Sequence, residues 1–126
     1  MKTYIADTNI FIRFFIKDEE KFYKKAENYL SDAKDGKIII ILPSPVIFEI
    51  DYVLMCVYKF SRQERVGALS ILIKSPYLEV EERSIFSEVI ELYAKKNIDL
   101  VDLYLIEKAK LRKAEVLSFD RDILKK

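Results

Sequence analysis

The sequence contains no histidine, and this absence excludes several kinds of active site. Ser-His-Asp and Cys-His triads need an imidazole base, and so do acid–base pairs built on histidine. The single cysteine, Cys56, stands in the apolar stretch YVLMCVY, where a small buried residue is expected, and it has no partner for an intrachain disulfide. Zinc sites made of histidines or several cysteines are excluded as well.

Glycine, proline and long apolar runs are also scarce. The chain has 2 glycines and 3 prolines, is 51% hydrophobic and 34% charged, and is therefore typical of a compact protein rather than a disordered one. The longest apolar run, IIIIL, is far too short to span a membrane, and the N-terminus lacks the pattern of a signal peptide. We therefore expect a cytoplasmic protein with no membrane partner. The 22 basic and 21 acidic residues give no basic excess, so a nucleic-acid partner must be argued from local features.

Short, mostly apolar segments alternate with helical patterns along the 126 residues, a length that suits one domain. The apolar segments predict strands at residues 3–6, 37–42, 77–80 and 115–119, buried on both faces. Helical spacing groups apolar residues on two faces: Phe22, Ala26, Tyr29, Leu30 and Ala33, then Phe86, Val89, Ile90 and Tyr93. The alternation predicts an α/β fold, a single domain over residues 1–126 with a short, mainly parallel central sheet flanked by helices.

Local signals mark where helices begin and end. Ser44 and Pro45 have the pattern of an N-cap and a first helical residue, and Asp99 has that of an N-cap. The segment KDGK at residues 34–37 predicts a helix stop followed by a turn. Ligands of parallel sheets bind beyond the carboxyl ends of the strands, so residues that follow the predicted strands are the first candidates for a site.

Four acids stand at positions that such a fold would bring to one region. Asp7 follows the first predicted strand and Asp120 the last, so both would lie at the carboxyl edge of the sheet. Glu49 lies in PSPVIFEIDYVLM, on a helical face where a carboxylate would be partly buried, and Asp102 begins an apolar helical stripe. Each also has a structural explanation, because the three aspartates can cap or start helices and Glu49 can turn to solvent.

Four carboxylates at one sheet edge would repel one another unless a cation neutralised them. Oxygen ligands without histidine or cysteine suit Mg²⁺ or Mn²⁺, which keep bound waters and take phosphate oxygens as further ligands. One or two such ions can orient and deprotonate a water for in-line attack on a phosphodiester and offset the charge on the leaving oxygen. The four acids therefore favour a phosphate-handling metal site.

The ordered set of motifs resembles the PIN-domain nucleases. The resemblance rests on ADTN at Asp7, the segment that ends on Glu49 and Ile50, DLVDL at Asp102 and SFDRD at Asp120. It extends over residues 4–122. Within that family the chain is similar to the small VapC-like ribonuclease toxins of bacteria and archaea, which match its length and the order of its acids.

The resemblance implies both an activity and a set of site residues. It implies a Mg²⁺- or Mn²⁺-dependent endoribonuclease that leaves 5′-phosphate and 3′-hydroxyl ends, forms a homodimer and is inhibited by a partner antitoxin. The residues implied at the metal are Asp7, Glu49, Asp102 and Asp120, with Asn9 supporting the first acid or the substrate. Asn9 is also compatible with helix-start chemistry alone. The chain departs from the family pattern at Ser118, where threonine is common.

Further charged residues flank these acids. Asp122 is either an exposed first-turn acid or an outer ligand, in contrast to Asp99, which we interpret as a helix cap. Basic side chains that could contact RNA phosphates are Arg13, Lys17, Arg121, Lys125 and Lys126. Such contacts would supply affinity but would not identify bases.

Two other functions remain open. One is a small Mg²⁺-dependent phosphatase, although many phosphatases carry a second aspartate two residues after the first, where this chain has Asn9. The other is a non-catalytic binding module, in which the acids cap helices while the eight phenylalanines and eight tyrosines serve packing and association. Assays of RNA cleavage and of phosphate-ester turnover would separate the three.

Overall fold

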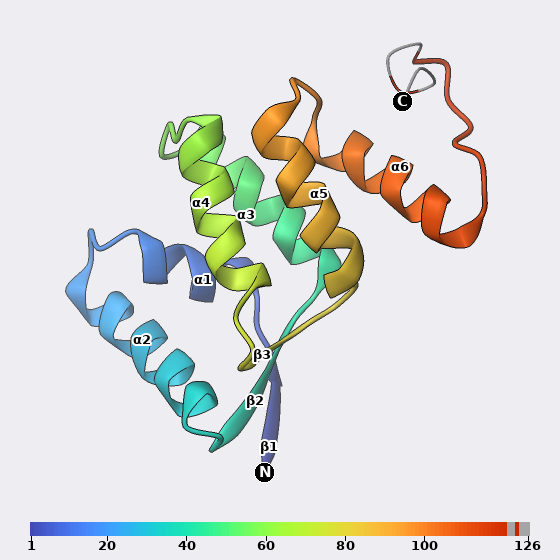
Figure 1. The fold of residues 1–126 in the computed structure, drawn as a ribbon. Helices are drawn as coiled ribbons and strands as arrows, with labels where there is room; N and C mark the ends of the chain where they lie inside the picture. The colour runs from blue at the N-terminus through green and yellow to red at the C-terminus, as the bar shows by residue number, and fades with distance from the viewer. Residues whose placement is uncertain (121–122, 124–126) are drawn as a thin grey trace. The chain divides into compact units, whose positions relative to one another are not determined.

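The computed structural model describes residues 1–120 and 123, and the chain divides into two compact units, Met1–Glu81 and Glu82–Lys126 (Figure 1). The first unit contains β1 (Lys2–Ile5), α1 (Thr8–Phe15), α2 (Glu20–Lys34), β2 (Ile38–Leu42), α3 (Ser44–Cys56), α4 (Arg62–Ile73) and β3 (Leu78–Val80). The second contains α5 (Arg83–Lys95) and α6 (Leu100–Arg112). The predicted α/β class is confirmed, whereas the single domain over residues 1–126 stays a prediction.

The sheet has the order β1-β2-β3 and both strand pairs are parallel. Lys2 lies opposite Ile38, and Ile40 lies opposite Leu78. The first three predicted strands are therefore confirmed to within a residue of their observed ends. The carboxyl ends of parallel strands meet at one edge, so the residues that follow β1, β2 and β3 come together at the edge where ligands of such sheets bind.

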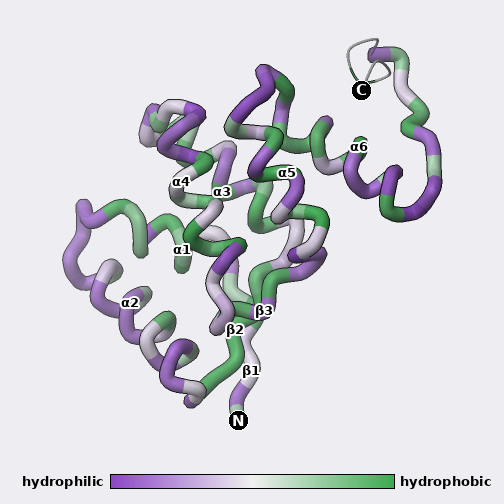
Figure 2. The backbone as a smooth tube through the Cα atoms, viewed as in Figure 1, coloured by the Kyte–Doolittle hydropathy of each residue, from purple (hydrophilic) through white to green (hydrophobic). Residues whose placement is uncertain are grey.

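The prediction that the strands are buried on both faces is wrong for β1. Ile5 is 74% exposed, and Lys2 and Thr3 are exposed as well. Burial on both faces requires a cover of helices, and in the first unit α2 packs against the central strand β2. β2 is accordingly hydrophobic along its length (Figure 2), and its residues Ile40 and Leu42 are buried.

The predicted strand at residues 115–119 is also wrong. This segment has no regular structure, and the side chains of Leu117 and Phe119 are fully exposed, at 101% and 107%. Its sequence favours an extended backbone, but a strand forms only where its peptide groups pair with another strand. In the described part of the chain the sheet consists of β1, β2 and β3 alone.

Helix packing builds the core of the first unit. α1 packs against α2 and α3, α3 packs against α4, and α4 reaches β3. The largest fully buried side chains there are Phe11, Ile12, Ile40, Leu42, Ile47, Ile50, Leu54, Leu69, Leu72 and Ile73. The predicted helix stop is confirmed, because α2 ends at Lys34 and Gly36 follows with φ +77°, a left-handed conformation that glycine adopts without steric cost.

In the second unit α5 and α6 pack against each other. The predicted apolar face of α5 is confirmed, because Phe86, Val89, Ile90 and Tyr93 are all buried. α6 contributes Leu100, Leu103 and Ile106 to the same core. Among the described helices of both units, none combines the length and the apolar character needed to cross a membrane.

Candidate functional site

Asp7 follows β1 after one intervening residue, Ala6, at the carboxyl edge of the sheet as predicted, and is the N-cap of α1. Its Oδ1 accepts a hydrogen bond from the backbone N–H of Asn9, 3.1 Å away. Asp7 and Asn9 are both exposed. The capping explanation for Asp7 is therefore confirmed, and the same geometry presents an oriented carboxylate to solvent at the place where a ligand of the sheet would bind.

Glu49 lies on the exposed side of α3, so the expectation of a partly buried carboxylate there is wrong. The inward face of α3 consists of Ile47, Ile50, Asp51 and Leu54. These positions follow the i, i+3, i+4, i+7 spacing of a single helical stripe, and Glu49 falls outside it. The buried acid of this helix is Asp51.

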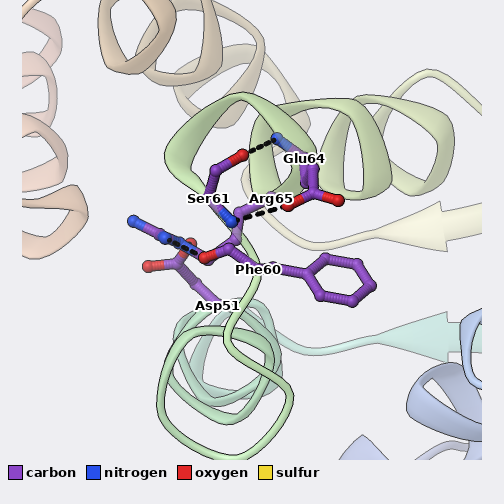
Figure 3. Close-up of polar contacts among 5 residues, drawn as sticks. All are labelled: Asp51, Phe60, Ser61, Glu64 and Arg65. Atoms are coloured by element: carbon purple, nitrogen blue, oxygen red, sulfur yellow. Dashed lines mark hydrogen bonds and ion pairs between the residues drawn. The ribbon is translucent and has the colours of Figure 1, made fainter.

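The buried Asp51 forms an ion pair between two helices (Figure 3). Arg65 of α4 donates from Nε to Asp51 Oδ1 at 2.9 Å, and its Nη1 donates to the carbonyl of Phe60, also at 2.9 Å. The side chain of Asp51 is 10% exposed and that of Arg65 is 7% exposed. This pair joins α3, the helix that carries Glu49, to α4. No local pattern in the sequence predicts this pair, because its two residues lie 14 positions apart in the chain.

A capping box starts α4 beside this pair (Figure 3). The Ser61 hydroxyl accepts from the backbone N–H of Glu64 at 3.2 Å, and a Glu64 carboxylate oxygen accepts from the backbone N–H of Ser61 at 2.8 Å. These hydrogen bonds, first of all the one from the Ser61 backbone, lower the pKa of Glu64. The spacing of a serine and a glutamate three residues apart was a signal that could have identified this helix start.

A second acid at the carboxyl edge, Glu81, was also missed. α3 begins at Ser44, one residue earlier than predicted, and Pro43 in the N-cap position offers no side-chain hydrogen bond. Glu81, which follows β3, instead accepts from the backbone N–H of Ser44 at 3.1 Å, and its own N–H donates to Leu42 O at 3.0 Å. Glu81 therefore fixes the first turn of α3 against the ends of β2 and β3.

In the second unit, Asp99 is the N-cap of α6 as predicted, although its side chain makes no capping hydrogen bond. Asp102 stands half-buried in the first turn. Burial raises the pKa of Asp102, and the negative charges of Asp99 and Asp120 raise it further. The exposed Asp120 donates from its backbone N–H to Ser118 Oγ at 2.9 Å, so Ser118 shapes the turn before this acid. Asp102 and Asp120 are thus close enough to interact electrostatically.

The four predicted acids divide between the two units, with Asp7 and Glu49 in the first and Asp102 and Asp120 in the second. Within either unit taken by itself, the described residues contain no group of three acids or cysteines that could hold a metal ion. A shared four-acid site stays a prediction. Asp122 lies outside the described residues, as do Arg121, Lys125 and Lys126.

Other contacts hold α6 against the start of α5. Tyr104 donates its hydroxyl to Glu82 Oε1 at 2.6 Å, and Lys108 Nζ donates to the Tyr104 oxygen and pairs with Glu82 Oε2, both at 3.0 Å. The Tyr104 ring also stacks on Phe86, with 5.4 Å between the ring centroids. Burial and the hydrogen bond to Glu82 raise the pKa of Tyr104. These contacts fix the orientation of the helix that carries Asp102.

Two of the cations predicted to contact RNA lie beside aromatic rings. They are Arg13, in α1, and Lys17, just after it. The Arg13 guanidinium lies 5.5 Å from the centroid of Phe22 and pairs with Asp18 at 2.9 Å. Lys17 Nζ lies 4.8 Å from the centroid of Tyr23. Both cations therefore stand beside rings along α2, and Arg13 lies on the same helix as Asn9.

The resemblance to the PIN-domain family is confirmed by comparison with known proteins. The model of the PIN domain family matches residues 4–126. A relative described as "VapC ribonuclease", from Aquifex aeolicus (strain VF5), is 26% identical over 118 residues, which cover 93% of this chain and 87% of the relative. Both findings support the resemblance to VapC-like members of the PIN-domain family. Because the family match covers nearly the whole sequence, this chain belongs to the PIN domain family.

Proposed function

We propose that this protein is a Mg²⁺- or Mn²⁺-dependent endoribonuclease, the toxin of a toxin–antitoxin pair. The observation that carries the proposal is the PIN domain match over residues 4–126, which includes all four predicted metal-site acids. The similarity to a relative described as a ribonuclease supports RNA as the substrate. Burial raises the pKa of Asp102 and the charges of Asp99 and Asp120 raise it further, and acids whose pKa is raised in this way are common at functional sites.

The carboxylates fit the proposed ion, because Mg²⁺ and Mn²⁺ prefer oxygen ligands and the chain offers no histidine. Asp7, Glu49, Asp102 and Asp120 would hold the ion. A bound ion would act as a Lewis acid, which would polarise the phosphodiester and lower the pKa of a bound water. The backbone of Asn9 orients Asp7, Glu81 holds the first turn of α3, and Ser118 shapes the turn before Asp120.

Purified protein should cut single-stranded RNA in Mg²⁺ or Mn²⁺ and leave it intact in EDTA. Asp7→Asn should abolish this cleavage, because an amide is a poorer ligand for these ions than a carboxylate. Asp35→Asn, which changes an exposed acid at the end of α2, is the matched control and should cut normally. Asp120→Asn should impair cleavage far more than Asp122→Asn, and the reverse ranking would reassign the fourth ligand.

The same preparation separates the competing functions. Turnover of a chromogenic phosphate ester without RNA cleavage would identify a phosphatase instead. Neither reaction would identify a non-catalytic binding module. Full cleavage by Asp7→Asn would contradict the proposed site.

We further propose that the protein acts in the cytoplasm as a homodimer and binds an antitoxin. The family resemblance supports both partners. Exposed apolar side chains, such as Val57 just after α3, Ile71 on α4 and Leu111 on α6, are compatible with association. An antitoxin helix would dock its apolar face into a groove. Light scattering should give the mass of a dimer, and a monomer mass at every concentration would contradict this half of the proposal.

A further inference from the structure

Two hollows adjoin on the first unit, next to Asp7. The first, about 270 Å³, lies along β1 and includes Tyr4, Ile5 and Asp7 in its lining. The second, about 250 Å³, lies at α1 and α2 and includes Arg13, Phe22 and Lys25. Ile10 and Tyr29 line both hollows, so the two are neighbours, and together we call them the α1–α2 groove.

Aromatic rings form much of this groove. Tyr29 and Phe22 are 43% and 45% exposed, an unusual degree for rings that helical spacing places on the apolar face of α2. Tyr4 meets Tyr29 edge to face, with 5.8 Å between the ring centroids and 64° between the ring planes. Exposed rings of this kind are platforms on which nucleobases stack, without regard to base identity.

Cations accompany the rings. Arg13 lies against Phe22, and Lys2 Nζ lies 5.2 Å from the centroid of Tyr4. Lys25 lines the groove, whereas its neighbour Lys24 pairs with Glu20 at 3.3 Å. Proteins that bind single-stranded nucleic acid combine aromatic rings with adjacent cations, because bases stack on the rings and phosphates contact the cations. Each hollow is smaller than the roughly 300–1,000 Å³ of a pocket for a drug-sized ligand.

We propose that the α1–α2 groove binds unpaired nucleobases of an RNA strand beside Asp7, with Tyr29 and Phe22 as stacking platforms and Lys25 as a phosphate contact. The inference rests on the proposed ribonuclease function, and it adds the surface that would hold the bases of the substrate. Stacking requires a base that is not already stacked within a duplex.

Binding of a short fluorescent single-stranded RNA in EDTA tests the proposal without cleavage. Tyr29→Leu keeps the apolar bulk but loses the ring, and it should bind roughly 5- to 150-fold more weakly, the range for loss of one stacked base. Tyr29→Phe should bind like the wild type. The control Tyr52→Leu removes a 61% exposed ring on α3 and should have no effect. Thermal scans of each variant establish that it is folded.

Abasic probes and salt titrations separate the two kinds of contact. An abasic strand should bind the wild type more weakly but should lose little more with Tyr29→Leu, because the ring then has no base to stack on. Lys25→Gln should reduce the slope of log affinity against log salt by about 0.7, the value for one phosphate contact with a single strand. Lys24→Gln should reduce it less.

The outcomes distinguish this inference from the function on which it rests. If the wild type cuts RNA while Tyr29→Leu binds the probe as tightly as the wild type does, the ribonuclease stands and the groove is overturned as an RNA site. In that case the groove becomes a candidate site for a protein partner. If the wild type neither binds nor cuts RNA under any metal condition, the proposed function fails and this inference fails with it.

Discussion

Replacing Asp102 with asparagine is expected to stabilise the metal-free protein and at the same time to remove most of its RNA cleavage. Asp102 is half-buried in the first turn of α6, and its pKa is raised by burial and by the charges of Asp99 and Asp120. An ionised Asp102 therefore destabilises the folded state. Asparagine has nearly the same shape without the charge, so the variant should gain about 0.5 kcal/mol or more in EDTA, the lower end of what charge optimisation commonly yields.

The pH dependence fixes the sign of this effect. A carboxyl whose pKa is raised on folding is protonated in both states below its ordinary value of 3.8, and it is ionised in both states well above its folded pKa. Between the two the folded protein binds more protons, so stability falls as pH rises. Asp102→Asn should remove this part of the decline, and its advantage over the wild type should disappear in acid.

In Mn²⁺ the order of stability should reverse, so that the wild type becomes more stable than Asp102→Asn. Mn²⁺ stabilises the folded protein only through its affinity for it, by about 2.7 kcal/mol at 100 times the dissociation constant, and Asp102→Asn should lose most of that gain. Its cleavage rate should fall by more than about 100-fold, since loss of an outer partner of a metal ligand already costs about 10- to 100-fold. The control Asp99→Asn relieves the same repulsion and should keep its activity. If Mn²⁺ leaves the melting temperature of the wild type unchanged, the proposed metal site is contradicted.

Replacing Asp51 with asparagine should destabilise the protein by about 3–5 kcal/mol, the usual consequence of breaking a buried ion pair. The change leaves the Arg65 guanidinium charged, 7% exposed and without its carboxylate at 2.9 Å. A loss of this size is a large fraction of the total stability of a small protein. Urea unfolding, with equal slopes for the two proteins, would measure it.

Two further variants test whether burial of the ion pair causes the loss of stability expected for Asp51→Asn. Removing both charges with Asp51→Leu and Arg65→Met should recover much of the loss, because apolar replacements of a buried pair are often neutral or stabilising. Asp18→Asn breaks the more exposed Arg13–Asp18 pair of the same 2.9 Å length and should cost about 0–1 kcal/mol. A larger loss for Asp18→Asn than for Asp51→Asn would overturn this account of α3 and α4.

Features that depend on neighbouring residues could be predicted from the sequence. Short, mostly apolar segments predicted β1, β2 and β3, and the apolar spacing predicted the inward face of α5. Gly36 ended α2 because the left-handed turn there favours glycine. Asp7 was placed after the first strand and Asp99 at the start of α6 by the same local reasoning. The ordered acids identified the PIN domain family.

Tertiary structure alone decided which face of α3 turns inward and which extended segment becomes a strand. α3 is apolar nearly all round, so periodicity did not select between the stripe with Glu49 and the stripe with Ile47, Ile50 and Asp51. Packing against α1 and α4 selected the second, and the Arg65 partner made a buried Asp51 tolerable. Residues 115–119 have strand-like side chains but pair with no strand among the described residues. Burial and strand pairing are relations between distant segments, whereas helix spacing and capping are properties of adjacent ones.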